Sequence, residues 1–192
     1  QHYPEGATFL SAMGFGNLYP CVSMDISLPL FVIPTDVQAT VWQRQQEGYR
    51  FEPLSLPYVL KTIDLAHSHF HADWGRSVRE ALAAGVPHDR FLIAIGPYDE
   101  VVGFCMWGAY DHAPDRFGPF GVLEKERGKG LGKILLYLGL EAMRTMGVHD
   151  AWCLWTGENG PAGRLYKRAG FTVTRRFTVM KKQLTHMEGE MA

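Results

Sequence analysis

The hydrophobic positions of this chain fall into two kinds of pattern. Apolar residues between 131 and 146 recur at intervals of three and four, which places them on one face of a helix. Residues 91–95, 101–107 and 151–155 are uninterrupted apolar runs, typical of strands that are buried on both faces. Helices and strands therefore follow one another irregularly. This order predicts an α+β (mixed α/β) fold, with one central, mixed and twisted β-sheet flanked by helices on both faces.

Glycine and proline residues mark the ends of the other predicted elements and divide the chain. Residues 1–30 have the pattern of a helix followed by a strand, and residues 31–48 are a linker or a peripheral helix. A continuous domain spans residues 49–184, and residues 185–192 are a polar tail. We expect further helices at 6–13, 58–69, 74–84 and from 161, and further strands at 22–28, 50–54, 117–122 and 171–181.

The composition is that of a folded protein without a membrane span. Of the 192 residues, 46% are apolar and 12% aromatic, and 19 basic side chains balance 20 acidic ones, which excludes disorder. The longest apolar run, 134–140, is far shorter than the roughly 20 residues that cross a bilayer. No signal-peptide pattern opens the chain. The cysteines, Cys21, Cys105 and Cys153, are odd in number and widely spaced, which favours a reducing, cytoplasmic location.

The net charge of −1 conceals an uneven distribution along the chain. Residues 1–122 carry 7 basic and 13 acidic side chains, whereas residues 123–184 carry 12 and 5. A basic segment beside an acidic one suggests that one half holds an anion with several charges while the other attracts a cation. Random scatter of charges can produce the same split. No nucleic-acid or membrane partner is expected.

A glycine-rich segment lies where a predicted strand leads into the amphipathic helix. It consists of Arg127, Gly128, Lys129, Gly130, Leu131, Gly132 and Lys133. Free backbone N–H groups and the positive end of the helix dipole favour a diphosphate there. A P-loop would need Ser or Thr in place of Ile134, and a dinucleotide fingerprint would need glycine in place of Lys133. The remaining pattern is R/Q-x-x-G-x-G/A, although a helix start that merely tolerates glycine looks the same.

A second motif follows about thirty residues downstream. It reads Asn159-x-x-Ala162-x-x-Leu165-Tyr166-x-x-x-Gly170-Phe171. Together and in this order, the two motifs resemble those of the GNAT superfamily of acyl-CoA-dependent N-acetyltransferases. The resemblance covers roughly residues 49–184 and implies the GNAT fold, with acetyl-CoA as cosubstrate and an amine of a small molecule or peptide as acceptor.

The resemblance also implies roles for individual residues. Residues 127–133 would hold the CoA pyrophosphate through backbone amides more than through side-chain charge. Phe120, Gly121 and Val122 would form the strand that pairs with the pantetheine arm, and an N–H near Val122 would stabilise the oxyanion. Asn159 would hydrogen-bond the pantetheine, with a helix N-cap as the alternative. Tyr166 would be the general acid that protonates the leaving thiolate, with an ordinary buried tyrosine as the alternative.

The general base is left open by the sequence. Asp111, His112 and Asp115 in one loop, and Glu158 beyond the strand 151–155, are candidates by position, and of these Asp111 and Glu158 are our choices. A base that works through a chain of water molecules would leave no sequence pattern. The cysteines are not required because direct transfer needs no covalent intermediate, so we expect them to be inert core residues.

The histidine-rich segment 67–74 has two interpretations. His67 and His71 are one helical turn apart, but no Glu follows in the arrangement of a zinc protease, and no metal is expected. In the GNAT superfamily the first two helices and their junction wall the acceptor site. Phe70, His71 and Trp74 are therefore acceptor-side candidates, and plain packing is an equal alternative for the two aromatic residues.

The chain also contains a weak internal repeat. A shift of 156 residues places Phe9 to Phe15 on Leu165 to Phe171, with Gly14 on Gly170. Residues 1–30 thus resemble the C-terminal end of a degenerate GNAT unit, as in the C-terminal part of a tandem GNAT protein, because Leu10 replaces the catalytic tyrosine. Chance similarity is the alternative. We expect this segment to dock as an edge element of the domain.

The most consistent interpretation is an N-acetyltransferase that moves an acetyl or similar acyl group from acetyl-CoA to an amine by direct transfer. The first alternative is a non-catalytic acyl-CoA-binding or regulatory module with the same fold, and the second is a nucleotide-phosphate binder. The acceptor and the oligomeric state are not fixed by the sequence, and a homodimer is compatible with it.

Overall fold

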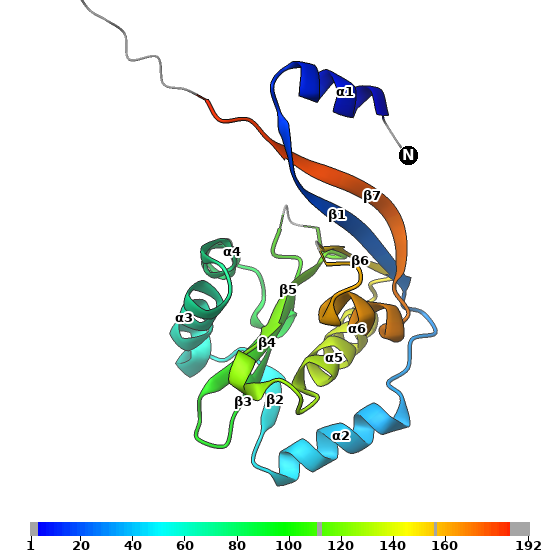
Figure 1. The fold of residues 1–192 in the computed structure, drawn as a ribbon. Coiled ribbons are helices and arrows are strands. Elements are labelled where there is room, and N and C mark those ends of the chain that lie inside the picture. The colour runs from blue at the N-terminus through cyan, green and yellow to red at the C-terminus, as the bar shows by residue number, and fades with distance from the viewer. Residues whose placement is uncertain (1–3, 111–112, 156, 185–192) are drawn as a thin grey trace, which may run out of the picture.

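The computed structural model describes residues 4–110, 113–155 and 157–184 (Figure 1). The helices are α1 (Pro4–Ala12), α2 (Thr35–Gln46), α3 (Val59–His69), α4 (Ala72–Ala83), α5 (Leu131–Thr145) and α6 (Pro161–Ala169). The strands are β1 (Gly16–Ser27), β2 (Arg50–Pro53), β3 (Phe91–Ile95), β4 (Val101–Trp107), β5 (Phe117–Val122), β6 (Asp150–Trp155) and β7 (Thr172–Lys181). This content confirms the predicted α+β class. The polar tail 185–192 lies outside the described residues.

The strands form two antiparallel sheets instead of one continuous sheet. The first has the order β2-β3-β4-β5 and the second the order β6-β1-β7. The two sheets touch where β5 and β6 begin, through a parallel bridge between Arg116 and Trp152. There the Trp152 N–H donates to the Asp115 carbonyl oxygen at 3.0 Å. From Phe117 onward β5 is therefore an edge strand of its sheet, and this edge faces the second sheet.

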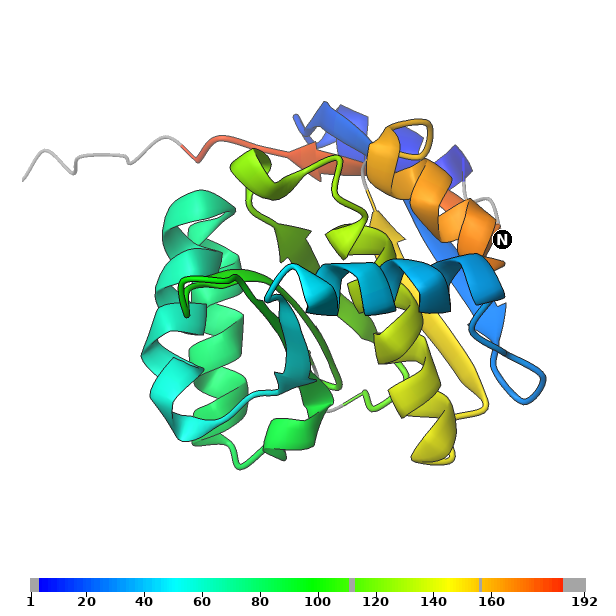
Figure 2. The same cartoon turned by 90° about the horizontal axis from the view of Figure 1, so that it is seen from below.

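Helices cover both faces of the four-stranded sheet. Helices α3 and α4 pack together on one face, and α5 lies against the other (Figures 1 and 2). Leu131, Ile134 and Leu135 of α5 are fully buried, as the helical spacing predicts, whereas Met146 lies beyond the end of the helix and is exposed. Helix α2 runs across α5 and covers part of its opposite side (Figure 2). No described helix is long and apolar enough to cross a membrane.

β1 is the central strand of the three-stranded sheet, so the predicted docking at an edge is wrong. Residues 22–27 pair with β6, and residues 16–25 pair with β7. Val22, Met24 and Ile26 are buried. The sequence pattern shows only this inner half of the strand, because residues 16–20 contain Gly, Asn and Pro, which are typical of turns.

The β1–β7 ladder has an approximate two-fold symmetry. Two register shifts leave Leu18 of β1 and Thr174 of β7 without a partner across the ladder, and these residues are 156 positions apart. The same shift exchanges the pair Tyr19–Val179 with the pair Ser23–Arg175 and relates Cys21 to its own partner Phe177. The ladder thus has two-fold symmetry about the Cys21–Phe177 pair. Its period equals that of the internal repeat found in the sequence.

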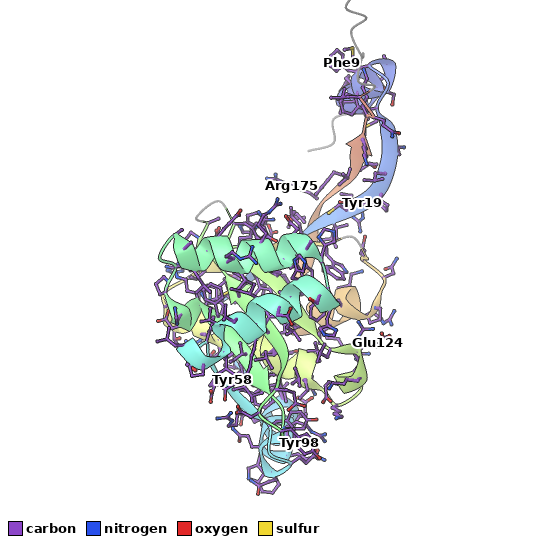
Figure 3. The ribbon with its side chains drawn as sticks, turned by 90° about the vertical axis from the view of Figure 1, so that its left-hand side faces the viewer. Phe9, Tyr19, Tyr58, Tyr98, Glu124 and Arg175 are labelled. Carbon is purple, nitrogen blue, oxygen red and sulfur yellow. The ribbon has the colours of Figure 1, made fainter. Side chains whose placement is uncertain are left out.

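The outer part of β1 and β7 extends from the body as a two-stranded arm that carries α1. Figure 3 shows Phe9 near the far end of this arm, with Tyr19 and Arg175 nearer the body. No described residue of α1 is buried, and Phe9, Met13 and Leu18 are exposed. In α6, the equivalent helix by the repeat, Gly163, Tyr166 and Ala169 are buried. The two helices therefore have similar sequences but different surroundings.

The central position of β1 generates a first prediction. Substituting Met24 by Ala removes a fully buried side chain between the sheet and its covering helices, and should lower the free energy of unfolding by about 2–5 kcal/mol. Leu18→Ala, on the exposed bulge of the same strand, is the matched control and should stay within about 0.5 kcal/mol of the parent. Urea unfolding measures both values, and equal losses would show that β1 is only loosely attached.

Candidate active site

The edge of β5 has backbone groups that no described strand pairs. The Leu123 N–H donates to the Val102 carbonyl oxygen on β4 at 2.9 Å. Since N–H groups point to alternate sides along a strand, the N–H of the preceding Val122 points away from β4. Phe120, Gly121 and Val122, predicted to pair with pantetheine, lie on this edge strand and are each partly exposed. The edge can therefore accept an extended ligand by backbone pairing.

A cavity of about 140 Å³ opens between β5 and β6. Its lining comes from β5 (Phe117, Gly118, Pro119 and Phe120), from β6 (Cys153, Leu154 and Trp155), from α6 (Tyr166), and from Trp74, Tyr110 and Arg116. The cavity is mainly aromatic and lies immediately beyond the bridge that joins the two sheets. This position makes it the place where a group held along β5 would meet the side chain of Tyr166.

Tyr166 lies in an aromatic cluster at this cavity. Its ring centroid is 5.3 Å from that of Phe171, 6.1 Å from those of Phe120 and Trp155, and 6.4 Å from that of Phe117. Among the described residues, none forms a hydrogen bond with its hydroxyl. Burial, aided by the nearby Cys153 and Cys105, holds the pKa of Tyr166 well above its usual range. The phenol is therefore protonated at neutral pH, as a general acid must be.

The glycine-rich loop approaches the same edge from the start of α5. Gly128 and Gly130 have φ near +82°, a conformation that favours glycine. The first hydrogen bond of α5 runs from the Ile134 N–H to the Gly130 carbonyl oxygen, so the N–H groups of Leu131, Gly132 and Lys133 precede the hydrogen-bonded turns. A Cβ on Gly132 would lie 3.6 Å from Phe120. The end of the loop thus lies directly beside Phe120 of β5.

Each basic side chain of this loop faces a carboxylate. Arg127 lies 3.5 Å from Glu124, Lys129 lies 2.8 Å from Glu126, and Lys133 lies 3.0 Å from Asp36. These contacts reduce the positive charge available to a ligand. They support recognition of a diphosphate by backbone N–H groups, which the sequence analysis predicts for this loop.

Glu158 and Asn159 lie in the loop between β6 and α6, beside a different and larger cavity. This cavity, of about 910 Å³, is bounded by that loop, by α1, and by β1 and β7. Gly160 is the N-cap of α6 and no side-chain hydrogen bond caps this end, so the capping alternative for Asn159 is wrong. Glu158 contacts Arg176 at 2.9 Å and Lys167 at 3.1 Å, and these hydrogen bonds lower its pKa. Both contacts weaken the case for Glu158 as a base.

The acceptor-side candidates fall into two groups. Phe70 packs on β5, where a Cβ on Gly121 would come within 2.6 Å of its ring. Trp74 stacks on Phe70 with ring centroids 5.4 Å apart, and it lines the small cavity. His71 is the N-cap of α4, and its Nδ1 accepts a hydrogen bond from the Asp73 N–H at 3.1 Å. The aromatic pair therefore borders the site, while His71 has a role in capping a helix.

None of the remaining candidates adds a general base to this site among the described residues. Asp111 and His112 are among the residues whose structure is not described. Asp115 lines another cavity, beside the end of α5. Cys21, Cys105 and Cys153 are buried free thiols, and burial raises the pKa of Cys153 to about 12, as expected for an inert core residue. Among the described residues, no group of three or more His, Cys, Asp or Glu side chains could hold a metal ion.

Two cavity residues escaped the sequence analysis. The Arg116 guanidinium lies 4.1 Å from the ring centroid of Tyr110 and 5.2 Å from that of Trp152. Both Tyr110 and Arg116 line the small cavity. They lie on either side of a polar loop that no motif covers, so only their position next to the strand 117–122 could have indicated a role.

Comparison with known proteins fits this arrangement. The profile of the Acetyltransferase (GNAT) family matches residues 56–171. This chain belongs to the GNAT family. A mycothiol acetyltransferase of Arthrobacter sp. (strain FB24) is 34% identical over 118 residues, which cover 56% of this chain and 36% of that protein. The chain thus aligns with about a third of the length of this curated relative.

Solved GNAT structures share the fold over nearly the whole chain. A GCN5-related N-acetyltransferase from Sphaerobacter thermophilus superimposes with a TM-score of 0.70 and 19% identity, over 94% of this chain and 56% of that one. A tandem GNAT protein from the clavulanic acid biosynthesis pathway gives a TM-score of 0.64 and 17% identity, over 93% and 58% of the two chains. At these identities the likeness shows the fold.

The glycine-rich loop generates a second prediction. Gly128 has a positive φ and nothing within 4 Å of an added Cβ, so Gly128→Ala adds strain and a methyl group that only a ligand would meet. Gly147, at the other end of α5, has the same φ and equally open surroundings, which makes Gly147→Ala a matched control. We expect Gly128→Ala to weaken CoA binding about tenfold, or about 1.4 kcal/mol, and Gly147→Ala to leave it unchanged. Calorimetric titration with CoA measures both.

Equal effects of the two substitutions would argue against backbone recognition, because the strain alone would then explain them. Thermal unfolding provides the internal check. Both variants should lose about 1 kcal/mol of stability or slightly more, since alanine at positive φ is strained to a similar degree in each.

Proposed function

We propose that this chain is an N-acetyltransferase, which moves an acetyl or similar acyl group from acetyl-CoA to an amine by direct transfer. One observation carries the proposal. Phe120, on the unpaired edge of β5, lies next to Gly132 of the glycine-rich loop, and its ring centroid is 6.1 Å from that of Tyr166. The loop, the edge and the phenol therefore follow one another as the diphosphate, the extended arm and the thioester do in acetyl-CoA. Acetyl-CoA would supply the activated acyl group.

Each part of this site has a task in acyl transfer. The amine attacks the thioester carbonyl carbon, a C–N bond forms and the C–S bond breaks. The N–H of Val122, which points away from β4, would donate to the carbonyl oxygen as negative charge develops there. The phenol of Tyr166 would give its proton to the departing sulfur, and solvent would restore that proton later.

The base that removes the proton of the attacking ammonium is assigned to no described residue. Glu158 is held by Arg176 and Lys167, and these contacts lower the pKa of its carboxyl group, which makes it a weaker base. Asp111 stays a prediction, as does proton transfer through water. Phe70 and Trp74 would form the wall on which the acceptor rests, because they cover β5 opposite α6. The acidic first part of the chain is compatible with a cationic amine.

The setting of the enzyme is a further part of this proposal. Three buried, free thiols suit a reducing compartment, so we propose a cytoplasmic location. The homodimer stays a prediction.

We also propose that residues 1–30 are the C-terminal end of a second, degenerate GNAT unit. The two-fold ladder supports this, because Leu18 and Thr174 bulge at equivalent positions of the repeat. Helix α1 then has the place that α6 has here, but Leu10 stands where α6 carries Tyr166. Such a unit would lack the general acid.

This proposal predicts that α1 contributes much less than β1 to the stability of the domain. A chain without residues 1–12 should melt within about 3 °C of the parent, because α1 buries no residue of its own here, and a loss below about 1 kcal/mol shifts the melting temperature little at this size. Differential scanning calorimetry tests it. A loss as large as that expected for Met24→Ala would place α1 in this folding unit and contradict the proposal.

The enzyme assignment itself is tested at Tyr166. Tyr166→Phe keeps the ring and its four aromatic neighbours, so folding and CoA affinity should stay within a few-fold of the parent. Loss of the acidic proton should lower kcat by about tenfold or more, near the low end of the range for general acids, because a thiolate is a tolerable leaving group. Release of the CoA thiol with a panel of amines measures kcat.

Tyr137→Phe is the control for this substitution. Tyr137 is also a buried tyrosine, but its hydroxyl donates to the Arg168 carbonyl oxygen at 3.1 Å, away from the cavity between β5 and β6. The Tyr137→Phe substitution should therefore leave kcat unchanged. A parent protein that binds CoA and acylates no amine of the panel would favour the alternative of a non-catalytic acyl-CoA-binding module.

A further inference from the structure

The glycine-rich loop is attached to the segment that precedes β2. The Tyr49 hydroxyl donates to Glu126 Oε2 at 2.6 Å, and Lys129 Nζ donates to the same oxygen at 2.8 Å and to the Tyr49 hydroxyl at 2.7 Å. Tyr49 and Glu126 are buried, 5% and 8% exposed, whereas the end of Lys129 reaches the surface. These three residues, the Tyr49 triad, connect positions 77 and 80 residues apart in the chain.

Helix α2 makes two more contacts with the same loop. Asp36 pairs with Lys133 at 3.0 Å. Thr40 lies directly beside Gly130, where an added Cβ would come within 3.0 Å of the Thr40 methyl group. Tyr49 follows α2 immediately, and its N–H donates to the Arg44 carbonyl oxygen at 3.0 Å. Residues 36–49 thus hold one side of the loop, while the side of Gly128 is open.

We propose that Tyr49 and Glu126 are positioning residues for the CoA diphosphate, which hold the loop in its binding conformation and keep Lys129 as a structural cation instead of a phosphate ligand. The inference rests on the proposed function. Glu126 directly precedes Arg127, and Lys129 lies between two glycines with positive φ. Glycines give the free loop many conformations, and each must be given up on binding unless other contacts already restrict them.

The electrostatics of the triad agree with this role. Burial by itself raises the pKa of Glu126, but the hydrogen bonds from Lys129 and Tyr49 outweigh it, and the resulting pKa is lowered. The hydrogen bonds that Lys129 donates to Glu126 and Tyr49 raise its pKa above the usual range. A carboxylate and an ammonium are therefore both charged at neutral pH and neutralise each other. A phosphate that drew Lys129 away would leave the buried carboxylate of Glu126 without its cation, which is costly.

The molecule contains a matched control for the triad. Tyr58 is buried like Tyr49, and its hydroxyl donates to Asp99 Oδ1 at 2.5 Å and accepts from Arg50 Nη2 at 2.7 Å. This cluster also combines a tyrosine, a carboxylate and a cation next to β2. However, it holds the turn between β3 and β4. Figure 3 shows Tyr58, and Tyr98 of that turn, on the part of the molecule opposite the arm.

The experiment compares Tyr49→Phe with Tyr58→Phe. Calorimetric titration should show Kd for CoA about three- to tenfold higher in Tyr49→Phe, the size of effect expected for one lost hydrogen bond, and unchanged in Tyr58→Phe. With a working acceptor, KM for acetyl-CoA should rise by the same factor while kcat stays constant. A merely structural role would lower stability in both variants and change neither Kd.

Glu126→Gln distinguishes positioning from direct phosphate binding. This substitution releases the charge of Lys129 with little change in shape. If Lys129 is a structural cation, Kd for CoA rises, whereas a tighter Kd with a steeper dependence on salt would show that Lys129 binds phosphate, and would overturn the proposal.

The outcomes separate this inference from the proposed function. If the parent binds CoA and Tyr49→Phe binds it equally well, the positioning role is wrong and the proposed function stands. If the parent does not bind CoA at all, both are wrong. A loss in Tyr49→Phe alone, at constant kcat, supports both.

Discussion

The architecture of this domain depends on the place where its two sheets part. Among the described residues, one bridge joins the two sheets, between Arg116 just before β5 and Trp152 of β6, and β5 continues from there as an edge. Unpaired backbone groups at the edge of a sheet need a partner, because leaving them buried and unsatisfied costs free energy. This need, and the aromatic cavity that opens beside it, make the gap between the sheets the candidate binding site. β1 pairs with both β6 and β7, so these three strands form the second sheet without a strand from the first.

The same constraint explains why side-chain charge contributes little to the candidate site. A ligand that lies along β5 meets outward-pointing N–H and C=O groups of the strand, and where it ends at the start of α5 it meets free N–H groups. The lysines and arginine of the loop are paired with Glu124, Glu126 and Asp36, so their charges stabilise the loop and leave recognition to the backbone. Local motifs carry this information only in part. Glycines with positive φ indicate that a ligand approaches the backbone, but the carboxylates that neutralise Lys129 and Lys133 come from the adjacent turn and from a distant helix.

The sequence predicts most of the elements, and it selects the candidate site residues whose motifs are local. Strands 91–95, 101–107 and 117–122 have the predicted bounds, because long apolar runs between turn residues allow few alternatives. Tyr166 and the loop 127–133 are found because each motif is local and has a characteristic spacing. Contacts between distant segments are not predicted. Tyr49 appears as an ordinary apolar residue before a strand, and β1 is wrongly placed at an edge, because the choice between edge and centre depends on which strands flank it. Likewise, Glu158 is a candidate base only by its position in the sequence, and its ion pair with Arg176 of β7 can be seen only in the structure.

The repeat shows that one local sequence pattern can occur in two different structural surroundings. Helices α1 and α6 both begin at a proline, end before a glycine with positive φ, and lead into strands that pair with each other about the Cys21–Phe177 pair. Helix α6 lies next to α5 and Phe171, so its inward face is buried and the hydroxyl of Tyr166 gains a raised pKa from that burial. The equivalent face of α1 buries no residue and bears Leu10, which has no proton to give. The difference between the two helices therefore lies less in the helix and turn than in what surrounds them. In the proposed function, such a helix could act as an acid only where it packs beside the edge of β5, as α6 does through Tyr166.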